Sequence, residues 1–284
     1  MLDNRYLTLS ILEQTKSYTK TAQQLFITQP AVSQQIKSLE TELDLKLVEY
    51  HHPQLKITHA GKQLAEFAAQ SNYQQQKLLS QLQDSKSRKH IKFGATHSIS
   101  VFYIPDLIQN LQKKFTHINC IVDNTSSLLE KIDNGTLDFA ILEGNFDKQH
   151  YDSIVLQNED FVAVTRFDNS IISTKNLELT SLLHEPLLLR ENGSGTRSIF
   201  INWAKTFNIQ VEDFSNIIEI GSSAGLLKVL QQTGISFMYQ SLITEQLQNN
   251  IFKILDIDGL TINRPISLVY AKDSFFKDEY SALI

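Results

Sequence analysis

The sequence predicts an α/β protein in three parts: a small helical unit, one long helix, and a larger domain of alternating strands and helices. Two observations support this prediction. Over the first 90 residues, apolar side chains recur at intervals of three and four, as on amphipathic helices. After residue 90, short apolar runs alternate with helical stretches, which is typical of an α/β domain with mainly parallel sheets.

Composition indicates a soluble chain without a membrane partner, metal or cofactor. Hydrophobic residues make up 42% and charged residues 20% of the 284 residues. No apolar run reaches the roughly 18 residues that a membrane span needs, and the first residues lack the pattern of a secretion signal. The one cysteine, Cys120, excludes an internal disulfide and a Cys-rich zinc site. We therefore expect a cytoplasmic protein.

Charge is distributed unevenly along the chain. The net charge is −5, but residues 1–89 hold 11 Lys and Arg against 8 Asp and Glu, a net charge of +3. Residues 90–284 hold 15 against 23, a net charge of −8. A mildly basic N-terminal unit on an acidic body is compatible with nucleic-acid binding at the N-terminus.

The N-terminal unit, residues 1–60, has the pattern of a winged helix-turn-helix. Two short apolar faces precede a third helix that we expect over residues 29–47. Thr28 is a suitable N-cap for it, and Pro30 fits its first turn, where a missing N–H costs nothing. After the polar residues 51–54, apolar and polar residues alternate through residue 58, which suits a small β-wing.

A long helix is predicted over residues 59 to about 87, within a linker segment of residues 61–89. Such a helix cannot bury its apolar stripe alone, so we expect it to pair with a partner helix. The charged residues 85–89 would form a hinge. The apolar positions are Leu64, Phe67, Ala68, Leu78, Leu79 and Leu82.

The larger domain, residues 90–284, shows two similar strand–helix units. The first has expected strands at 91–95, 119–122 and 139–142 and helices at 99–115 and 126–134. The second has strands at 187–189, 217–220 and 235–238 and helices at 196–207 and 224–232. This repetition predicts two lobes with a cleft between them, lobe I being residues 90–163 and 265–284 and lobe II residues 164–264. A last helix is expected over residues 274–284. A ligand should lie where strands end and helices begin.

Several helices of this domain are expected to begin with hydroxyl-bearing residues or glycines. In residues 190–197, two glycines let the backbone approach a ligand, and the following helix presents free N–H groups, which suits a small anion. The alternative for each hydroxyl is that it only caps its own helix. The candidate effector residues are Thr96, His97, Ser98, Thr125, Ser126, Gly193, Ser194, Gly195 and Thr196, and Ser222 and Ser223 begin a fourth such helix.

Residues 19–40, with the matches at 45–49 and 57–61, closely resemble the LysR-type transcriptional regulators. The order of parts agrees with that family: DNA-binding head, linker helix and two-lobed effector domain of periplasmic-binding-protein type. The resemblance implies a transcriptional regulator that binds double-stranded DNA and is controlled by a small effector. It also implies a homo-oligomer, a dimer of dimers. It also implies that the Thr96 and Thr125 loops line one side of the effector cleft and the 193–196 loop the other.

The resemblance places the first half of the third helix in the major groove. Its residues there are Gln29, Pro30, Ser33 and Gln34; glutamine can pair with adenine, and serine can approach base or phosphate. Candidates for phosphate contact are Lys37, Lys56 and Thr58. The alternative is that all of these are simply solvated positions.

The head departs from the family pattern at three positions. Asp44 stands where glycine is usual, Val48 replaces a phenylalanine, and Tyr50 stands where arginine is usual. The wing is also poor in cations, which predicts fewer phosphate contacts and a weaker grip on DNA by each head. Several heads bound together would then supply the affinity that one head lacks.

The run Arg190-Glu191-Asn192-Gly193-Ser194-Gly195-Thr196-Arg197 is similar to a signature of one branch of the family, which includes regulators of sulfur assimilation and carbon fixation. That branch implies an anionic effector such as sulfite, sulfate, or an acetylated or phosphorylated metabolite, with sulfur metabolism ranked first. We expect a structural role for Arg190, while Arg197 could bind the anion or pair with an acid such as Glu191.

Other functions remain as alternatives. An effector-independent DNA-binding regulator is one, and a solute-binding module without DNA function is another. We expect no enzymatic activity, because no nucleophile with a base, no metal set and no paired carboxylates stand out. Cys120 lies in an apolar run and is expected in the core.

Overall fold

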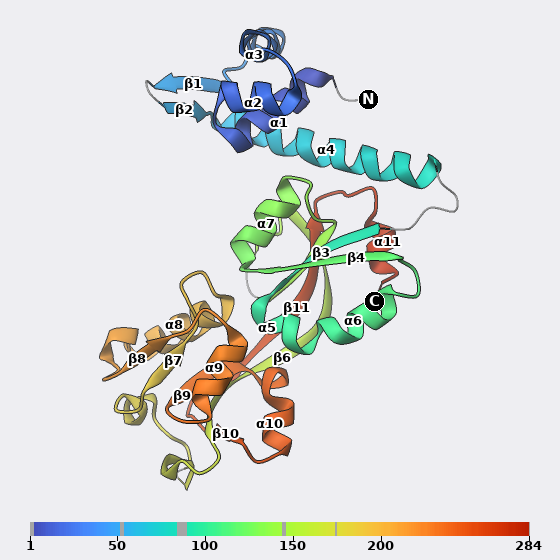
Figure 1. The fold of residues 1–284 in the computed structure, drawn as a ribbon. Coiled ribbons are helices and arrows are strands. Elements are labelled where there is room, and N and C mark those ends of the chain that lie inside the picture. The colour runs from blue at the N-terminus through green and yellow to red at the C-terminus, as the bar shows by residue number, and fades with distance from the viewer. Residues whose placement is uncertain (1–2, 52–53, 84–89, 144–145, 174, 284) are drawn as a thin grey trace.

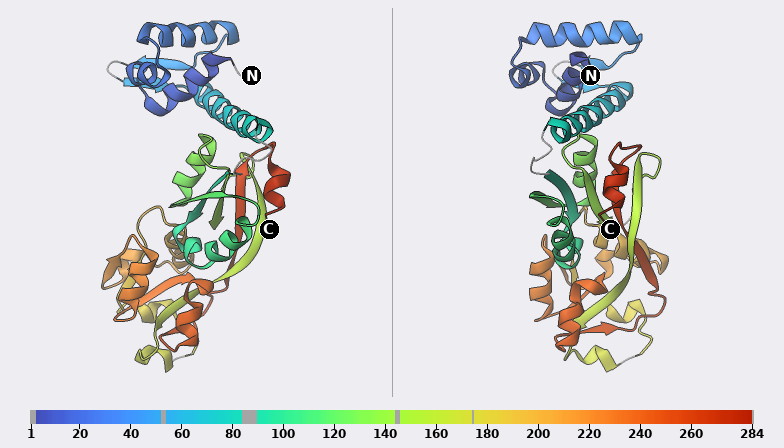
Figure 2. Two further views of the ribbon diagram at one scale, coloured as in Figure 1. Left: turned by 45° about the vertical axis from the view of Figure 1, so that its right-hand side comes forward. Right: turned by 90° about the vertical axis from the view of Figure 1, so that its right-hand side faces the viewer.

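The computed structural model describes residues 3–51, 54–83, 90–143, 146–173 and 175–283. The molecule is elongated, with the head at one end, lobe II at the other, and the long helix α4 and lobe I between them (Figures 1 and 2). The polar hinge predicted at residues 85–89 and the tip of the wing, residues 52–53, lie outside the described residues.

The head is a helix-turn-helix with a two-stranded hairpin. The Ser17 hydroxyl accepts from the N–H of Lys20, and the Thr28 hydroxyl accepts from that of Ala31, so each caps the helix that follows it. Pro30 lies in the first turn of its helix, as expected. The elements are α1 (Asn4–Thr15), α2 (Tyr18–Leu25), α3 (Gln29–Leu43), β1 (Val48–His51) and β2 (Gln54–Ile57).

The prediction that the third helix reaches residue 47 is wrong. Helix α3 ends at Leu43, and Asp44 adopts a left-handed conformation with φ of 51°. Such a conformation favours glycine but admits aspartate, which explains how Asp44 can replace the usual glycine. Beyond it, the Glu40 carboxylate accepts from the N–H groups of Leu47 and Val48 at 2.9 and 3.1 Å, which ties α3 to the start of the wing.

Helix α4 (His59–Gln83) runs between the head and lobe I and contacts both. Toward lobe I, Lys77 forms a buried ion pair with Asp138 at 2.7 Å and a second with Glu279 at 3.1 Å. The Lys77 ammonium also lies 4.2 Å from the ring centre of Phe276. Because the side chains of Lys77 and Asp138 are only 9% and 2% exposed, the charges are removed from water and depend on each other.

The effector domain contains one continuous sheet, which spans both lobes. Its strand order is β4-β3-β5-β11-β6-β9-β7-β8, with β10 also paired to β6. The strands of lobe I are β3 (His90–Thr96), β4 (His117–Asp123) and β5 (Phe139–Glu143), and those of lobe II are β7 (Leu187–Leu189), β8 (Ile217–Glu219), β9 (Ile235–Tyr239) and β10 (Phe252–Leu255).

The expectation of mainly parallel sheets needs a correction. Two long strands that the sequence did not reveal, β6 (Tyr151–Arg166) and β11 (Ile262–Ala271), pair antiparallel with each other. β11 is also antiparallel to β5, and the far half of β6 is antiparallel to β9 and β10. Only the β4-β3-β5 and β9-β7-β8 parts are parallel, as in the two predicted units.

The predicted helix over residues 99–115 is two helices, α5 (His97–Phe102) and α6 (Ile104–Leu111). Pro105 lies in the first turn of α6 and lacks the N–H that a continuous helix would use there. The last helix is also shorter than predicted, because α11 covers only Lys277–Ser281. The other helices of the domain are α7 (Thr125–Asp133), α8 (Gly195–Thr206), α9 (Ser223–Leu230) and α10 (Thr244–Gln248).

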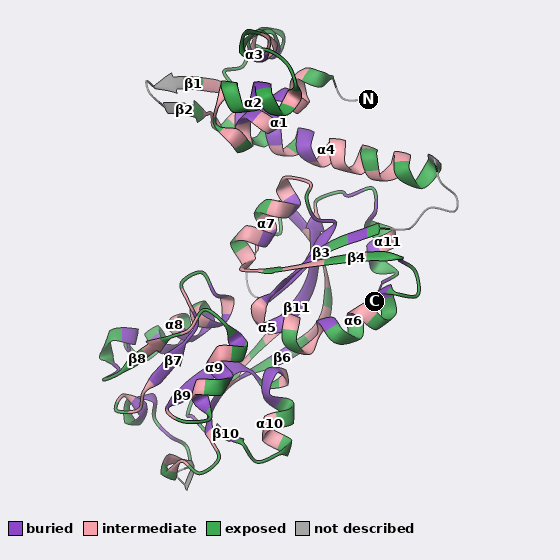
Figure 3. Ribbon diagram, in the orientation of Figure 1, coloured by how far each residue is buried: buried purple, intermediate pink, exposed green. Residues whose placement is uncertain are grey.

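Buried residues concentrate on the strands and on the inner faces of the helices that cover them (Figure 3). Each lobe has its own apolar core, built on Phe93 and Phe139 in lobe I and on Phe200 and Phe237 in lobe II. In the part of the chain that the structure describes, no helix is both long and apolar enough to cross a membrane.

The buried ion pair gives a test of how α4 is fixed to lobe I. Lys77→Met should lower the free energy of unfolding by about 3 kcal/mol, because it leaves the Asp138 carboxylate buried without its cation. The measurement is urea unfolding followed by circular dichroism. Lys62→Met is the matched control, because Lys62 pairs with Glu66 on the same helix but is itself 61% exposed, and it should cost less than about 1 kcal/mol. Equal losses for both variants would contradict this role of Lys77.

Candidate functional site

The outer face of α3 carries the predicted base-contacting residues. All of them are exposed, while Val32, Ile36 and Leu39 on the opposite face are buried against the head. Helix α3 also lies at the end of the molecule farthest from the effector domain, with no other described element in front of it (Figures 1 and 2). The face is therefore open to a DNA groove. The exposed residues are Gln29, Pro30, Ser33, Gln34 and Lys37.

The other two phosphate candidates differ in their surroundings. Lys56 is exposed on β2, across the hairpin from Glu49. The Thr58 hydroxyl donates to the carbonyl of Lys46 at 2.7 Å and accepts from the N–H of Gly61 at 3.0 Å, at the start of α4. Thr58 thus has a structural task that the sequence did not reveal.

Residues from both lobes meet in one cleft at the ends of the strands. This is the arrangement expected for an α/β domain, whose ligands bind beyond the carboxyl ends of parallel strands. Lobe I contributes Thr96, His97, Ser98, Asp123, Asn124, Thr125 and Glu143, and lobe II contributes Arg190, Glu191, Ser194 and Gly195.

Two of the cleft hydroxyls do not cap their helices. Thr96 and Ser194 occupy the N-cap positions of α5 and α8, but neither side chain accepts a helix N–H. Instead the Thr96 hydroxyl donates to the Glu143 carboxylate, and the Ser194 hydroxyl pairs with that of Thr196 at 2.9 Å. By contrast, Ser222 does cap α9. Simple capping therefore does not explain Thr96 and Ser194.

At the start of α7, neighbouring residues have different surroundings. Asn124 is the N-cap, and its side chain accepts from Ser127. The Thr125 hydroxyl lines the cleft and is buried without a hydrogen-bond partner among the described residues. Ser126, predicted beside it, is exposed and does not line the cleft. Across the cleft, a side chain on Gly193 would come within 3.8 Å of the Asn124 amide, so the lobes nearly touch here.

The two arginines of the 190–197 run are bound within lobe II. Arg190 is buried and forms a two-point ion pair with Glu191, at 2.8 and 2.9 Å, and donates to the Ser223 hydroxyl at 2.5 Å. Arg197 pairs with Glu219 at 2.7 Å and donates to the carbonyl of Arg190. Arg197 is thus paired with an acid, but with Glu219 of β8 and not with Glu191.

Glu143 is the cleft residue that sequence reasoning missed. It ends β5, which is buried throughout, and its own side chain is 3% exposed. Burial raises the pKa of the Glu143 carboxyl, although the hydrogen bond from Thr96 and the charge of Arg190 oppose that shift. The sequence feature that could have indicated Glu143 is its place at the end of an apolar strand, at the edge of the sheet where a ligand was expected.

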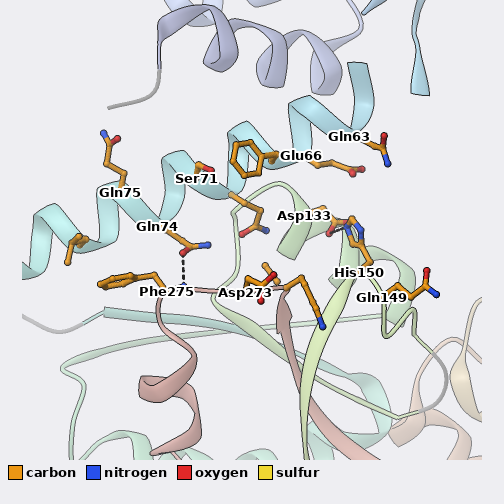
Figure 4. A pocket seen from close by; sticks show the side chains of 15 residues that line it. Gln63, Glu66, Ser71, Gln74, Gln75, Asp133, Gln149, His150, Asp273 and Phe275 are labelled. Atoms are coloured by element: carbon orange, nitrogen blue, oxygen red, sulfur yellow. Dashed lines mark hydrogen bonds and ion pairs between the residues drawn. The ribbon is translucent and has the colours of Figure 1, made fainter. Parts of the chain in front are cut away.

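The cleft is nearly filled by its own side chains, since its free volume is about 10 Å³. A larger hollow of about 680 Å³ lies between α4 and lobe I (Figure 4). There the Gln74 amide accepts from the N–H of Phe275, and Asp133 lies 3.3 Å from His150. Three acidic side chains, Glu66, Asp133 and Asp273, line this hollow beside one lysine, Lys272, and this excess of acidic groups disfavours an anion. The cleft between the lobes instead brings Arg190 together with the starts of α5, α7 and α8.

Comparison with known proteins defines the class of this chain. Residues 4–62 match the bacterial regulatory helix-turn-helix model of the lysR family, and residues 84–284 match the LysR substrate binding domain. The fold and these matches define a DNA-binding transcriptional regulator with a small-molecule effector domain. The chain belongs to the LysR family, whose members are regulators and not enzymes.

Relatives of known name span nearly the whole chain. The transcriptional activator CmpR of Synechocystis is 27% identical over 92% of this chain and 86% of its own length. The regulator CysL of Bacillus subtilis is 24% identical over 93% of this chain and 88% of its own length.

Two solved structures share the fold. ArgP from Mycobacterium tuberculosis is 17% identical, with a TM-score of 0.76, over 100% of this chain and 96% of that one. The regulatory domain of CcmR from Synechocystis, in complex with 2-PG, is 20% identical, with a TM-score of 0.60, over 68% of this chain and 95% of that one.

The single cysteine gives a test of the lobe I core. Cys120 is half-buried on β4, and burial raises the pKa of its thiol to about 11. Because the thiolate is the reactive form, Cys120 of the native protein should react with Ellman's reagent at pH 8 roughly 200-fold more slowly than an ordinary thiol. The same protein unfolded in urea is the control, and similar rates in both states would show that the native thiol is not shielded.

Proposed function

We propose that this regulator binds a small anion in the cleft between its lobes, and that this binding changes how its paired heads engage DNA. The observation that carries the proposal is the convergence of polar groups from both lobes on one cleft. Lobe I presents Thr96, His97 and Thr125, and lobe II presents Ser194 and Gly195. A ligand that contacts both sets would depend on how the lobes are placed.

The chemistry of the cleft favours an anion. The first-turn N–H groups of α8 lack a side-chain cap, and a helix start attracts negative charge. The Arg190 guanidinium lines the same cleft, where its charge is shared with its ion-pair partner Glu191. The CcmR regulatory domain was solved with 2-PG, which supports a small ligand in a domain of this fold. An effector-independent regulator would not need an unpartnered hydroxyl such as that of Thr125 in a buried cleft.

The proposed domains are residues 1–60 for DNA binding, 61–89 for the linker, and 90–284 for the effector.

The cleft holds about as much free space as a single water molecule needs, so an effector must move side chains or part the lobes. Lobe I is fixed to α4 by Lys77, and α4 packs against α1 of the head. A shift of lobe I would therefore be passed to the head.

The linker helix supports the proposed homo-oligomer. Phe67 and Leu82 of α4 are 63% and 71% exposed, although other apolar residues of the helix, such as Ala65 and Ala68, are buried. A second copy of α4 would cover these two side chains and place two heads side by side. We propose a dimer of dimers in the cytoplasm, whose paired heads bind DNA half-sites related by two-fold symmetry.

Two substitutions in the head distinguish base recognition from contact with the phosphates. Gln34→Ala should weaken binding to the cognate site by about tenfold and binding to random DNA much less, because a lost base contact costs about 1–3 kcal/mol only where the base matches. Lys56→Ala should weaken binding to both DNAs. It should also reduce the slope of log affinity against log salt concentration by about one. Both are measured by fluorescence anisotropy from 50 to 200 mM salt. An equal loss on both DNAs for Gln34→Ala would exclude base reading by that residue.

Two adjacent residues of α7 test the effector site. Thr125→Val should weaken binding of a small anion by about tenfold or more, since it removes a hydroxyl that could donate to a charged ligand. It should not destabilise the free protein, because that hydroxyl has no partner in the described structure. Ser126→Ala, one residue on and exposed, is the matched control. Inorganic phosphate and sulfate, titrated by calorimetry, are the probes. Loss of binding in both variants or in neither would contradict the proposed site.

A further inference from the structure

A buried carboxyl group lies in the cleft that we assign to an anion. Glu143 comes from lobe I, and its carboxylate faces the start of α8 in lobe II: a side chain on Gly195 would come within 3.5 Å of Oε1 of Glu143. The carboxylate accepts the Thr96 hydroxyl. The structure describes no ion pair between Glu143 and a cation, since Arg190 is already bonded to Glu191 and Ser223.

This position creates a conflict of charge. An oxyanion held by the α8 start would lie against Glu143, and two facing anions in a cleft with so little free volume repel strongly. Such pairs exist in proteins when one proton is shared between them. The proton must come either with the ligand or from Glu143 itself.

We propose that Glu143 is the specificity-determining residue of the cleft and selects oxyanions that keep a proton near neutral pH, such as hydrogen phosphate, over sulfate, which keeps none. The inference rests on the proposed anionic effector. A ligand that carries its own proton donates a hydrogen bond from that O–H to the Glu143 carboxylate. Sulfate can bind only when Glu143 is protonated, so it must take up one proton from solution on binding.

The other charged and titratable groups of the cleft have identifiable roles. The hydrogen bond from Ser127, together with Lys131, holds the pKa of Asp123 at about 2, so Asp123 stays ionised and engaged on lobe I. Glu191 is held by Arg190. Burial and the nearby Glu143 raise the pKa of Tyr239, so its hydroxyl stays protonated. His97 at the start of α5 also lines the cleft.

The test compares inorganic phosphate with sulfate on the full-length protein, by calorimetry between pH 6 and pH 9. In the wild type, sulfate affinity should fall as the pH rises, approaching tenfold per pH unit once free Glu143 is ionised, because one proton is taken up. Phosphate affinity should change much less, so the ratio of phosphate to sulfate affinity should rise with pH.

Two variants assign the effect. Glu143→Gln removes the ionisable acceptor and offers an amide donor, so sulfate should bind more tightly at high pH and the affinity ratio should become flat. His97→Gln should keep the rising ratio, because a change at His97 leaves the Glu143 carboxylate in place and would affect both anions alike. If Glu143→Gln does not fold, as checked by circular dichroism, the wild-type ratio alone decides.

The outcomes distinguish this inference from the proposed function. A wild-type ratio that stays flat, or a ratio that rises equally in Glu143→Gln, would overturn the role of Glu143 while leaving the anion site in place. Binding of neither anion to the wild type or to Glu143→Gln would overturn the proposed anionic effector, and this inference with it. Binding that Thr125→Val leaves unchanged would likewise place the anion outside the cleft.

Discussion

The antiparallel pairing of β6 with β11 is the constraint on which the effector domain depends. The two strands run side by side over ten residues of β11 and cross from one lobe to the other (Figure 1). β11 carries β5 of lobe I on its other edge, and the far half of β6 carries β9 of lobe II. The strand ends of both lobes therefore face one cleft, with Glu143 at the end of β5 and Tyr239 at the end of β9.

A second constraint links this cleft to DNA. Helix α4 packs against α1 in the head and is held on lobe I by the buried Lys77–Asp138 pair. Asp138 also accepts from the N–H of Lys92 on β3, the strand that ends at Thr96 in the cleft. A buried charge pair has few alternative arrangements, because each partner is costly to leave alone. The pair therefore ties the position of lobe I to that of the linker helix, so a shift of one would move the other.

The sequence was most informative where local chemistry decides the structure. The start of α3 followed from Thr28 and Pro30. The family resemblance supplied the order of the DNA-binding and effector domains, which the matches confirm. β6 escaped prediction because its middle, from Gln157 to Asp160, is polar, and its pairing partners lie about 70 to 120 residues away. Neither the partner of Arg197 nor the position of Glu143 opposite α8 follows from local sequence, since both depend on how distant strands are ordered in the sheet.

The closed cleft would couple recognition to movement if it binds the anion that we propose. Gly195 of lobe II lies against Glu143 of lobe I, and Gly193 lies near Asn124, so the helix starts that suit an anion are already covered by the opposite lobe. A carboxylate placed at a helix start occupies the position that a ligand anion would take. An anion must therefore displace Glu143 or share a proton with it. In either case, ligand binding changes the contact between the lobes at the binding site itself. The free energy of binding therefore depends on the placement of lobe II.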